Sequence, residues 1–249
     1  MSDFNMANRQ VCDVDIKFLA TKEPFLFFDT ANTTTAGLSS DSVYAMAKGT
    51  RRIAFANPLE GTMTIEAQVY PFRLFALFSD GTIDSSAAVA VHKEITCETA
   101  GELALTAGDG ETIQAGTVFA YPKGSYGVAA DKIEGTFASN KFTATEASKI
   151  AVGSAYEVGY IVTKTGVEKI AFNNKKLPAD YYITMTTLDK DELGTYTPFV
   201  MTAYKASIQR SFDLSFSSEG DPASVTLTFD LMEDKDGNIL DMVEYTEAE

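Results

Sequence analysis

The sequence predicts a mainly β protein, a β-sandwich or barrel flanked by one short α-helix. Three observations support this prediction. Apolar residues repeatedly alternate with polar ones, as Val225, Leu227 and Phe229 do, which is the pattern of strands with one buried face. Gly, Pro and Asp-Gly pairs interrupt the chain at short intervals. A single segment, residues 71–78, has the features of a helix, and many strands with little helix favour an all-β architecture.

The first strands lie near the N-terminus. Val14, Ile16 and Phe18 alternate with polar residues, and a short apolar run over residues 24–28 follows as a second strand. Residues 29–50 lose this pattern and are rich in Thr, Ser, Ala and Gly. A loop of that length is uncommon inside a compact domain, so we expect a long irregular hairpin.

A further strand and the helix come next. Met63, Ile65 and Ala67 alternate with polar residues over one strand. In residues 71–78 the leading proline suits a first helical turn, where its missing N–H is not needed, and a glycine at position 81 follows as a stop signal. This segment is short and nearly all apolar, so it must pack on a sheet.

The middle of the chain indicates short strands separated by turn residues, of which Tyr156 to Val162 is the clearest. We expect one discontinuous β domain formed by residues 1–92 and 166–249. Residues 93–165 are expected to be a β-rich insertion, and they can form a small subdomain.

Two hairpins are expected near the C-terminus. A strand over residues 211–216 leads to the turn sequence EGDP at 219–222, and the alternation from Val225 to Leu231 gives the next strand. Asp236-Gly237 suits a tight turn because both residues tolerate positive φ. The same region resembles a calcium loop only superficially, since its first and last carboxylate ligands are missing.

The charge of the chain disfavours binding to nucleic acid. Acidic residues outnumber basic ones by 35 to 20 over 249 residues, giving a net charge of -15, and residues 219–249 hold ten acids and one base. Such a surface repels phosphate. The N-terminus has no signal-peptide core and no apolar run long enough to span a membrane, so we expect a soluble protein made in a reducing cytoplasm.

No catalytic, cofactor-binding or metal-binding residues are predicted. The single histidine, His92, lies in ordinary strand surroundings and is expected to have a structural or surface role. One histidine and the distant Cys12 and Cys97 do not make a zinc site, and both cysteines are expected to be small buried residues. Paired carboxylates leave a carbohydrate-binding or hydrolytic β-sandwich as an alternative, which the absence of Trp disfavours.

Several segments, taken in order, resemble the tail tube proteins of contractile and long-tailed bacteriophages. They are Gly61–Glu66 followed by Tyr70-Pro71-Phe72, then FNNKKLPADYY at 172–182, TPFVM at 197–201, YKASIQ at 204–209, FDLSF at 212–216, EGDP at 219–222 and LMEDKDG at 231–237. The resemblance covers about two thirds of the chain. It lies in strand and turn segments, not in a catalytic signature.

The resemblance implies a β-sandwich of tail-tube type, whose flanking helix is residues 71–78. Subunits of such proteins form rings, commonly hexameric, that stack into a hollow tube for DNA. It also implies that the long hairpin or loop, residues 29–50, reaches the neighbouring ring. The candidate inter-subunit contacts are Asp29, Asp41, Tyr44, Arg51 and Arg52. Arg51 and Arg52 either pair with acids of an adjacent subunit or are exposed charges at a strand end.

The partners implied are further copies of the chain, a tape measure protein, a tail terminator, a baseplate and, in a contractile tail, a sheath. Phage DNA passes through the lumen without sequence-specific binding, and no cofactor or membrane is involved. The implied location is the virion tail, after assembly in the host cytoplasm. The alternative within the virion is a tail terminator, a baseplate component or a head decoration protein.

Overall fold

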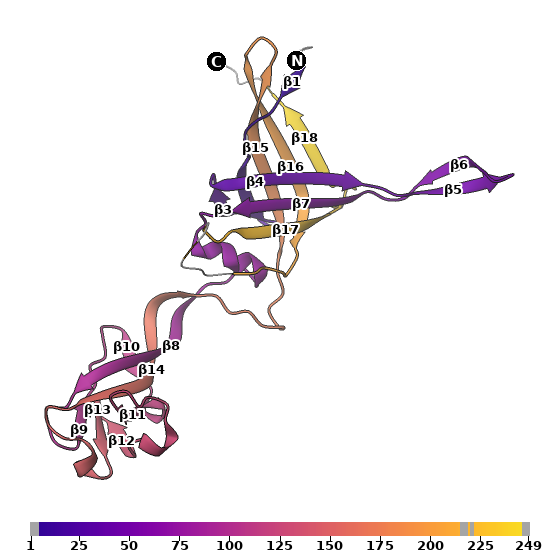
Figure 1. The fold of residues 1–249 in the computed structure, drawn as a ribbon. Coiled ribbons are helices and arrows are strands. Elements are labelled where there is room, and N and C mark those ends of the chain that lie inside the picture. Colours follow the sequence, from indigo (N-terminus) through magenta and orange to yellow (C-terminus); the bar gives the residue numbers. More distant parts are fainter. Residues whose placement is uncertain (1–4, 215–218, 220–221, 246–249) are drawn as a thin grey trace. The chain divides into compact units, whose positions relative to one another are not determined.

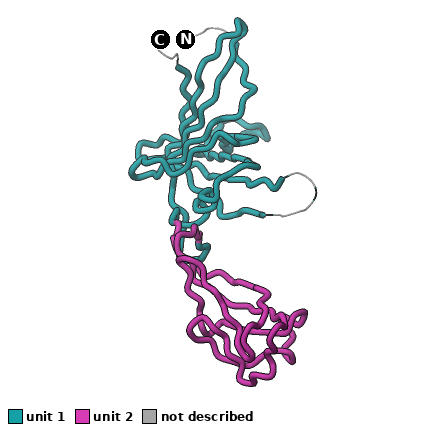
Figure 2. The backbone as a smooth tube through the Cα atoms, turned by 90° about the vertical axis from the view of Figure 1, so that its left-hand side faces the viewer, with its two compact units in different colours: residues 1–82, 171–249 teal, residues 83–170 magenta. Residues whose placement is uncertain are grey.

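The computed structural model describes residues 5–214, 219 and 222–245. It divides into two compact units, one formed by residues 1–82 and 171–249 and the other by residues 83–170 (Figure 2). The boundaries expected at 92/93 and 165/166 fall inside two strands, β8 (Asp84–Thr96) and β14 (Ala155–Lys169). These strands pair along most of their lengths, so both belong wholly to the second unit.

The first unit is built on one antiparallel sheet of nine strands (Figure 1). Its main path runs β3-β2-β15-β16-β17-β7-β4, while β1 pairs with β15 and β18 pairs with β16. The strands are β1 (Met6–Ala7), β2 (Asp13–Phe18), β3 (Pro24–Phe28), β4 (Ala31–Ser39), β7 (Glu60–Ala67), β15 (Asp180–Asp191), β16 (Tyr196–Ile208), β17 (Val225–Met232) and β18 (Leu240–Glu244).

Alternation in the sequence explains how this sheet builds its core. On β17, the residues from Val225 to Leu231 are alternately buried and turned outward, and β7 pairs with it and buries Met63 and Ile65. Val14 on β2 is likewise fully buried. Removing these apolar faces from water is the main favourable contribution to folding. The mainly β fold class predicted from the sequence is confirmed.

The helix predicted at residues 71–78 is present, but it is a 3-10 helix and not an α-helix. This element, η1 (Phe72–Phe78), begins after Pro71, whose carbonyl accepts a hydrogen bond from the Leu74 amide at 3.0 Å. Tight i to i+3 turns of this kind occur in short pieces, where packing and not helix length supplies the stability. Leu74 and Leu77 of η1 are fully buried.

The strand expected over residues 211–216 is not formed in its described part, residues 211–214. The ring of Phe212 instead packs against Phe75 and Phe78 of η1, at centroid distances of 5.6 and 4.6 Å, and against Phe172. The aromatic cluster therefore outweighs the local strand pattern. Phe216 and most of the EGDP turn lie outside the described residues.

Residues 29–50 belong mostly to paired strands, and each of the two ladders contains a register shift. After β4 come β5 (Ser42–Ala47) and β6 (Thr50–Ala56), which pair antiparallel. Lys48 and Gly49 join them with φ values of 51° and 79°, the tight hairpin turn in which both central residues have positive φ. The expected hairpin is thus formed, and its irregularities are the register shifts between Ala31 and Thr33 and between Ala45 and Met46.

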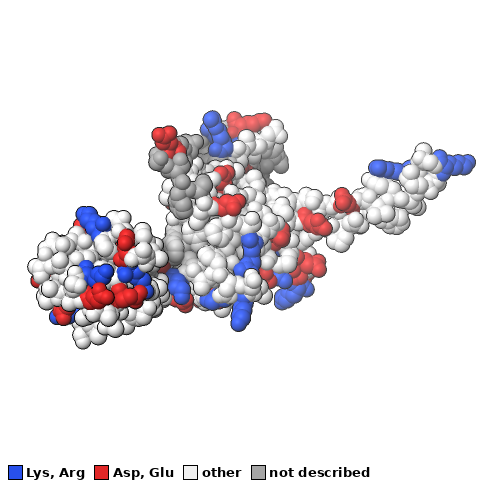
Figure 3. All heavy atoms as spheres, turned by 60° about the horizontal axis from the view of Figure 1, so that its bottom comes forward, with Lys and Arg blue, Asp and Glu red and all other residues white. Residues whose placement is uncertain are grey.

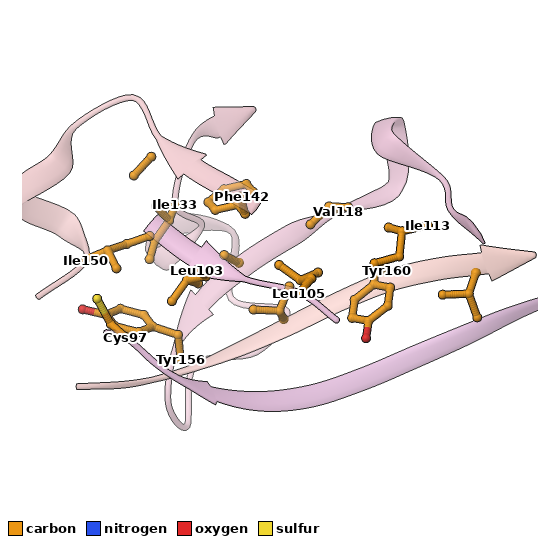
Figure 4. Close-up of a cluster of buried hydrophobic side chains, with 14 residues drawn as sticks. Cys97, Leu103, Leu105, Ile113, Val118, Ile133, Phe142, Ile150, Tyr156 and Tyr160 are labelled. Atoms are coloured by element: carbon orange, nitrogen blue, oxygen red, sulfur yellow. The ribbon is translucent and has the colours of Figure 1, made fainter. Parts of the chain in front are cut away.

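The second unit has its own core between two small sheets (Figure 4). Phe142, Leu103 and Ile150 pack there against Tyr156 of β14, and the buried Cys97 lies at one end. The other cysteine, Cys12, is also buried and free, as expected. The remaining elements are β9 (Glu102–Ala104), β10 (Glu111–Ile113), η2 (Ala115–Thr117), β11 (Phe119–Pro122), η3 (Ala129–Asp131), β12 (Gly135–Ala138), β13 (Lys141–Ala144) and η4 (Ala147–Lys149).

Candidate assembly interface

A two-stranded ribbon extends beyond the end of the β4–β7 ladder (Figure 1). We call residues 42–56, which comprise β5, the turn and β6, the arm. Two hydrogen bonds join the chain segments at its base. The Asn57 amide donates to the Asp41 carbonyl at 2.9 Å, and the Ser40 hydroxyl donates to the Asn57 carbonyl at 2.7 Å. The arm is therefore a separate two-stranded sheet joined to the end of the β4–β7 ladder.

The arm has no core of its own. All its residues are exposed, and they include four large apolar side chains with accessibilities of 57 to 60%: Val43, Met46, Ile53 and Phe55. An isolated two-stranded hairpin is marginally stable in water. Contiguous exposed apolar surface marks sites of interaction with other proteins. The arm thus has the character of a segment that is completed by a partner.

The register of the arm separates two faces. Val43 lies opposite Phe55, and Ala45 lies opposite Ile53, so one face is entirely apolar. A register shift follows at Arg52.

The other face of the arm carries Tyr44, Met46 and Arg51. The guanidinium carbon of Arg51 lies 4.2 Å from the centroid of the Tyr44 ring, in a cation–π contact.

The arm carries a positive charge on an acidic chain. Residues 42–56 contain Lys48, Arg51 and Arg52 and no acid, whereas the whole chain has a net charge of -15. Figure 3 shows these basic side chains toward the tip of the arm. Charges of opposite sign across an interface favour encounter and suppress wrong partners. An acidic, partly apolar surface is therefore the complementary target.

The structure brings four of the five predicted contact residues to this region. Tyr44, Arg51 and Arg52 lie in the arm, and Asp41 lies at its base. Asp29 lies elsewhere, because it precedes the end of β4 at which Ala31 pairs with Ala67. Sequence reasoning missed the apolar face, whose only signal was the alternate placing of Ile53 and Phe55 after the Lys-Gly turn.

A second surface of the first unit is polar and lies on the sheet itself. One row of directly paired residues runs across four strands: Asp15 of β2, Thr184, Thr202 and Asp241 of β18. Asp13 occupies the same face of β2, two residues from Asp15, and is exposed. This face therefore carries carboxylates and threonine hydroxyls.

Hydrogen bonds order the edge of this polar face. The Tyr204 hydroxyl donates to Asp241, and this bond to a carboxylate raises the pKa of Tyr204 to about 12. The ammonium of Lys17 lies 2.9 Å from Asp15. Lys17 pairs with Asp15, whereas Asp13 and Asp241 form no ion pair with the residues that the structure describes.

The residues considered for chemistry are dispersed. His92 is exposed on β8, stacked on Tyr126 at a centroid distance of 4.0 Å, and its Nε2 lies 4.0 Å from Glu157. Within the described ranges, no three side chains of His, Cys, Asp or Glu are grouped as metal ligands. A search of the same residues finds no helix with the length and apolar character needed to span a membrane.

The fold and the arm define a class of protein: a β-structural subunit that presents an exposed ribbon for contact with other proteins. The sequence from residue 9 to residue 244 matches the model of the YomU/Tube protein family. Since this match spans most of the chain, the protein belongs to that family, a family of phage tail tube proteins. It is thus a structural protein and a component of the virion tail. No curated protein matches the sequence.

Proposed function

We propose that this protein assembles with copies of itself into stacked rings that form the wall of a hollow tail tube. The observation that supports this most is the arm, an exposed ribbon with an apolar face in a chain of the tail tube family. Six copies is the expected number in each ring. The arm supplies contacts that a single subunit lacks, and it extends to an adjacent copy, in the same or the next ring.

Ring closure draws on the open edges of the nine-stranded sheet. In the described residues, β3 pairs with β2 alone, β4 with β7 alone and β18 with β16 alone. Unpaired strand edges are templates for pairing with another chain. Strand addition between subunits satisfies these edges and joins the sheets of neighbouring copies. A head-to-tail contact of this kind gives a ring when its rotation closes.

The polar face that carries Asp13, Asp15 and Asp241 is proposed as the channel wall. Acidic groups repel the phosphates of DNA, so DNA slides past such a wall without binding. The threonine hydroxyls beside them are small and neutral. The net charge of -15 supports the same role.

The wider assembly follows from this role. We expect contacts with a tape measure protein inside the tube, with a terminator and a baseplate at its ends, and with a sheath if the tail is contractile. Assembly takes place in the host cytoplasm, before the tail becomes part of the virion.

Negative-stain electron microscopy of the purified chain tests the proposal. We expect rings or tubes that grow in number with protein concentration or on a seeding complex. A chain that stays monomeric under all conditions, and that is absent from tubes in purified virions, contradicts it. Copy number in virions separates a tube subunit, which should give one of the most abundant bands, from a terminator, baseplate or decoration protein.

A further inference from the structure

An acidic hollow of about 470 Å³ lies beside the base of the arm. It is formed where β7 and β17 meet the chain that follows β17. Its lining contains three acids, Glu60, Asp230 and Glu233, and no lysine, arginine or histidine. Five apolar residues complete most of the surface: Pro58, Leu59, Leu231, Met232 and Ile239. Leu59 is 53% exposed, so the hollow offers apolar surface to a partner.

The other hollows described on this chain differ in charge. A larger one, on the other side of Met232 and Glu233, includes Lys17, Lys22, Lys205 and Lys235 in its lining. Two more include Lys190 and Lys132, respectively. Each of these linings also holds at least one acid, so their charges are mixed. A cationic segment meets like charges in each of them, and like-charge contacts disfavour a wrong docking site.

We propose that the acidic hollow of a second copy of this chain receives the arm. Val43, Ile53 and Phe55 cover its apolar floor, while Lys48 at the turn and Arg52 at the register shift face Glu60 and Glu233 of the other copy. Apolar surface meets apolar surface, and positive charges of the arm meet the acids of the hollow. This inference rests on the proposed function, because it names the surface through which self-assembly occurs.

The arm cannot fill the hollow of its own chain. Pro58 and Leu59 of the hollow directly follow the arm, so the hollow lies at its base. A strand of six residues such as β5 spans about 20 Å, which places the tip of the arm that far from the base. The docked tip therefore comes from another copy. Because arm and hollow are different surfaces, the contact is head-to-tail and repeats around a ring or along a tube.

Charge reversal tests the pairing in the full-length chain. K48E/R52E and E60K/E233K are each expected to raise the concentration at which tubes appear by about tenfold or more. A chain carrying all four substitutions is expected to recover assembly, because the charges are again complementary. E98K/E168K, which reverses two exposed acids of the second unit, is the matched control and should assemble like the unmodified chain.

The outcomes are separable. If E60K/E233K assembles normally while K48E/R52E does not, the arm docks elsewhere, and this inference is wrong while the proposed function stands. If the four-substitution chain stays unassembled, although circular dichroism shows it folded, the pairing is also wrong. If the unmodified chain never assembles, the proposed function and this inference fail together.

A cysteine pair provides a second test that does not depend on charge. K48C/E60C is expected to give a ladder of disulfide-linked multimers on a non-reducing gel after mild oxidation. The native Cys12 and Cys97 are buried and should not contribute. K48C/K190C, which places the second cysteine in a different hollow, is the control. Equal ladders from the two variants would overturn the inference.

Discussion

Arg51 lies over the ring of Tyr44, with its guanidinium carbon 4.2 Å from the ring centroid, and joins the two strands of the arm on one face. Such a contact contributes about 0.5–1 kcal/mol at an exposed site. On the opposite face, Val43 and Phe55 are 58% and 57% exposed, so no described side chain covers them as Arg51 covers Tyr44. The arm is thus ordered on one face and open for docking on the other.

Replacing Val43 and Phe55 by serine is expected to abolish self-assembly and to leave the protomer folded. Each exposed substitution should change the free energy of unfolding by no more than about 0.5 kcal/mol. Light scattering after size-exclusion chromatography measures assembly, and thermal unfolding measures the fold. V152S, at a valine of the second unit that is 62% exposed, is the control and should assemble normally. Normal assembly of V43S/F55S would show that this face is not an interface.

Gly61→Ala is expected to destabilise the first unit by about 1–3 kcal/mol, the usual cost of overpacking. A Cβ at Gly61 would lie 2.9 Å from the Leu231 Cβ and 2.9 Å from Leu38 Cδ2, between β17 and β4. Urea unfolding measures the change. Gly37→Ala is the matched control, because Gly37 pairs with the adjacent Thr62 and has nothing within 4 Å of its Cβ position. If the two variants are equally stable, the packing around Gly61 is looser than described.

The strands of the core could be predicted because burial of one face leaves an alternating pattern in the sequence. Val225 to Leu231 on β17 and Met63 to Ala67 on β7 show this, and their pairing follows. The arm could be predicted only as a hairpin, because both faces of β5 and β6 are exposed and no burial imposes a pattern on residues 42–47. Its charges were visible in the sequence, and its apolar face was not recognised.

Contacts between distant residues account for the remaining differences. Phe212 continues an alternating pattern, yet it packs with Phe75, 137 positions earlier in the chain, and no local signal indicates that contact. The acidic hollow likewise combines residues of β7 with residues of β17 and the chain after it. Only the fold brings Glu60 and Glu233 to the same surface.

Gly159→Ala is expected to displace Tyr126 while costing little stability. A Cβ at Gly159 would clash with the Tyr126 hydroxyl oxygen, but Tyr126 is 45% exposed and can rotate into solvent. His92 then loses its stacked ring, so its proton resonances should move downfield by NMR. Gly116→Ala, where nothing lies within 4 Å of the Cβ position, should leave them unchanged. A large loss of thermal stability instead would mean that Tyr126 is fixed in place.

Asp80 is expected to make stability depend on acid pH. Its pKa is lowered from 3.8 to about 2, first by a hydrogen bond from the Thr82 hydroxyl and also by Lys176, whose ammonium lies 3.1 Å away. Because the folded pKa is lower than the unfolded one, this stabilisation is complete above about pH 4 and is lost as the pH falls toward 2. These contacts join the two chain segments that flank the inserted unit.

Thr82→Val tests this dependence. The difference in Tm between the variant and the unmodified chain should be constant from pH 7 to about pH 5 and should shrink as the pH falls toward about 2. Thr226→Val, at an exposed position of β17, provides the control and should give a difference independent of pH. A Thr82→Val difference that persists unchanged at pH 2 would show that the Asp80 carboxylate is not its source.

Replacing Asp13 and Asp241 by lysine is expected to turn a DNA-repelling tube into one that retains DNA. Both acids are exposed on the polar face of the sheet, so the substitution should not disturb the core. Tubes of the variant should bind double-stranded DNA in a sedimentation assay at low salt, and the binding should fall steeply with rising salt, because phosphate contacts release counterions.

The control is E98K/D131K, which carries the same change in net charge on the second unit. DNA that enters the lumen should be retained by tubes of D13K/D241K and not by tubes of the control. Open tubes are incubated with DNA short enough to enter them and are then treated with nuclease. Protected DNA places the lysines in the lumen, and complete digestion places this face on the outside.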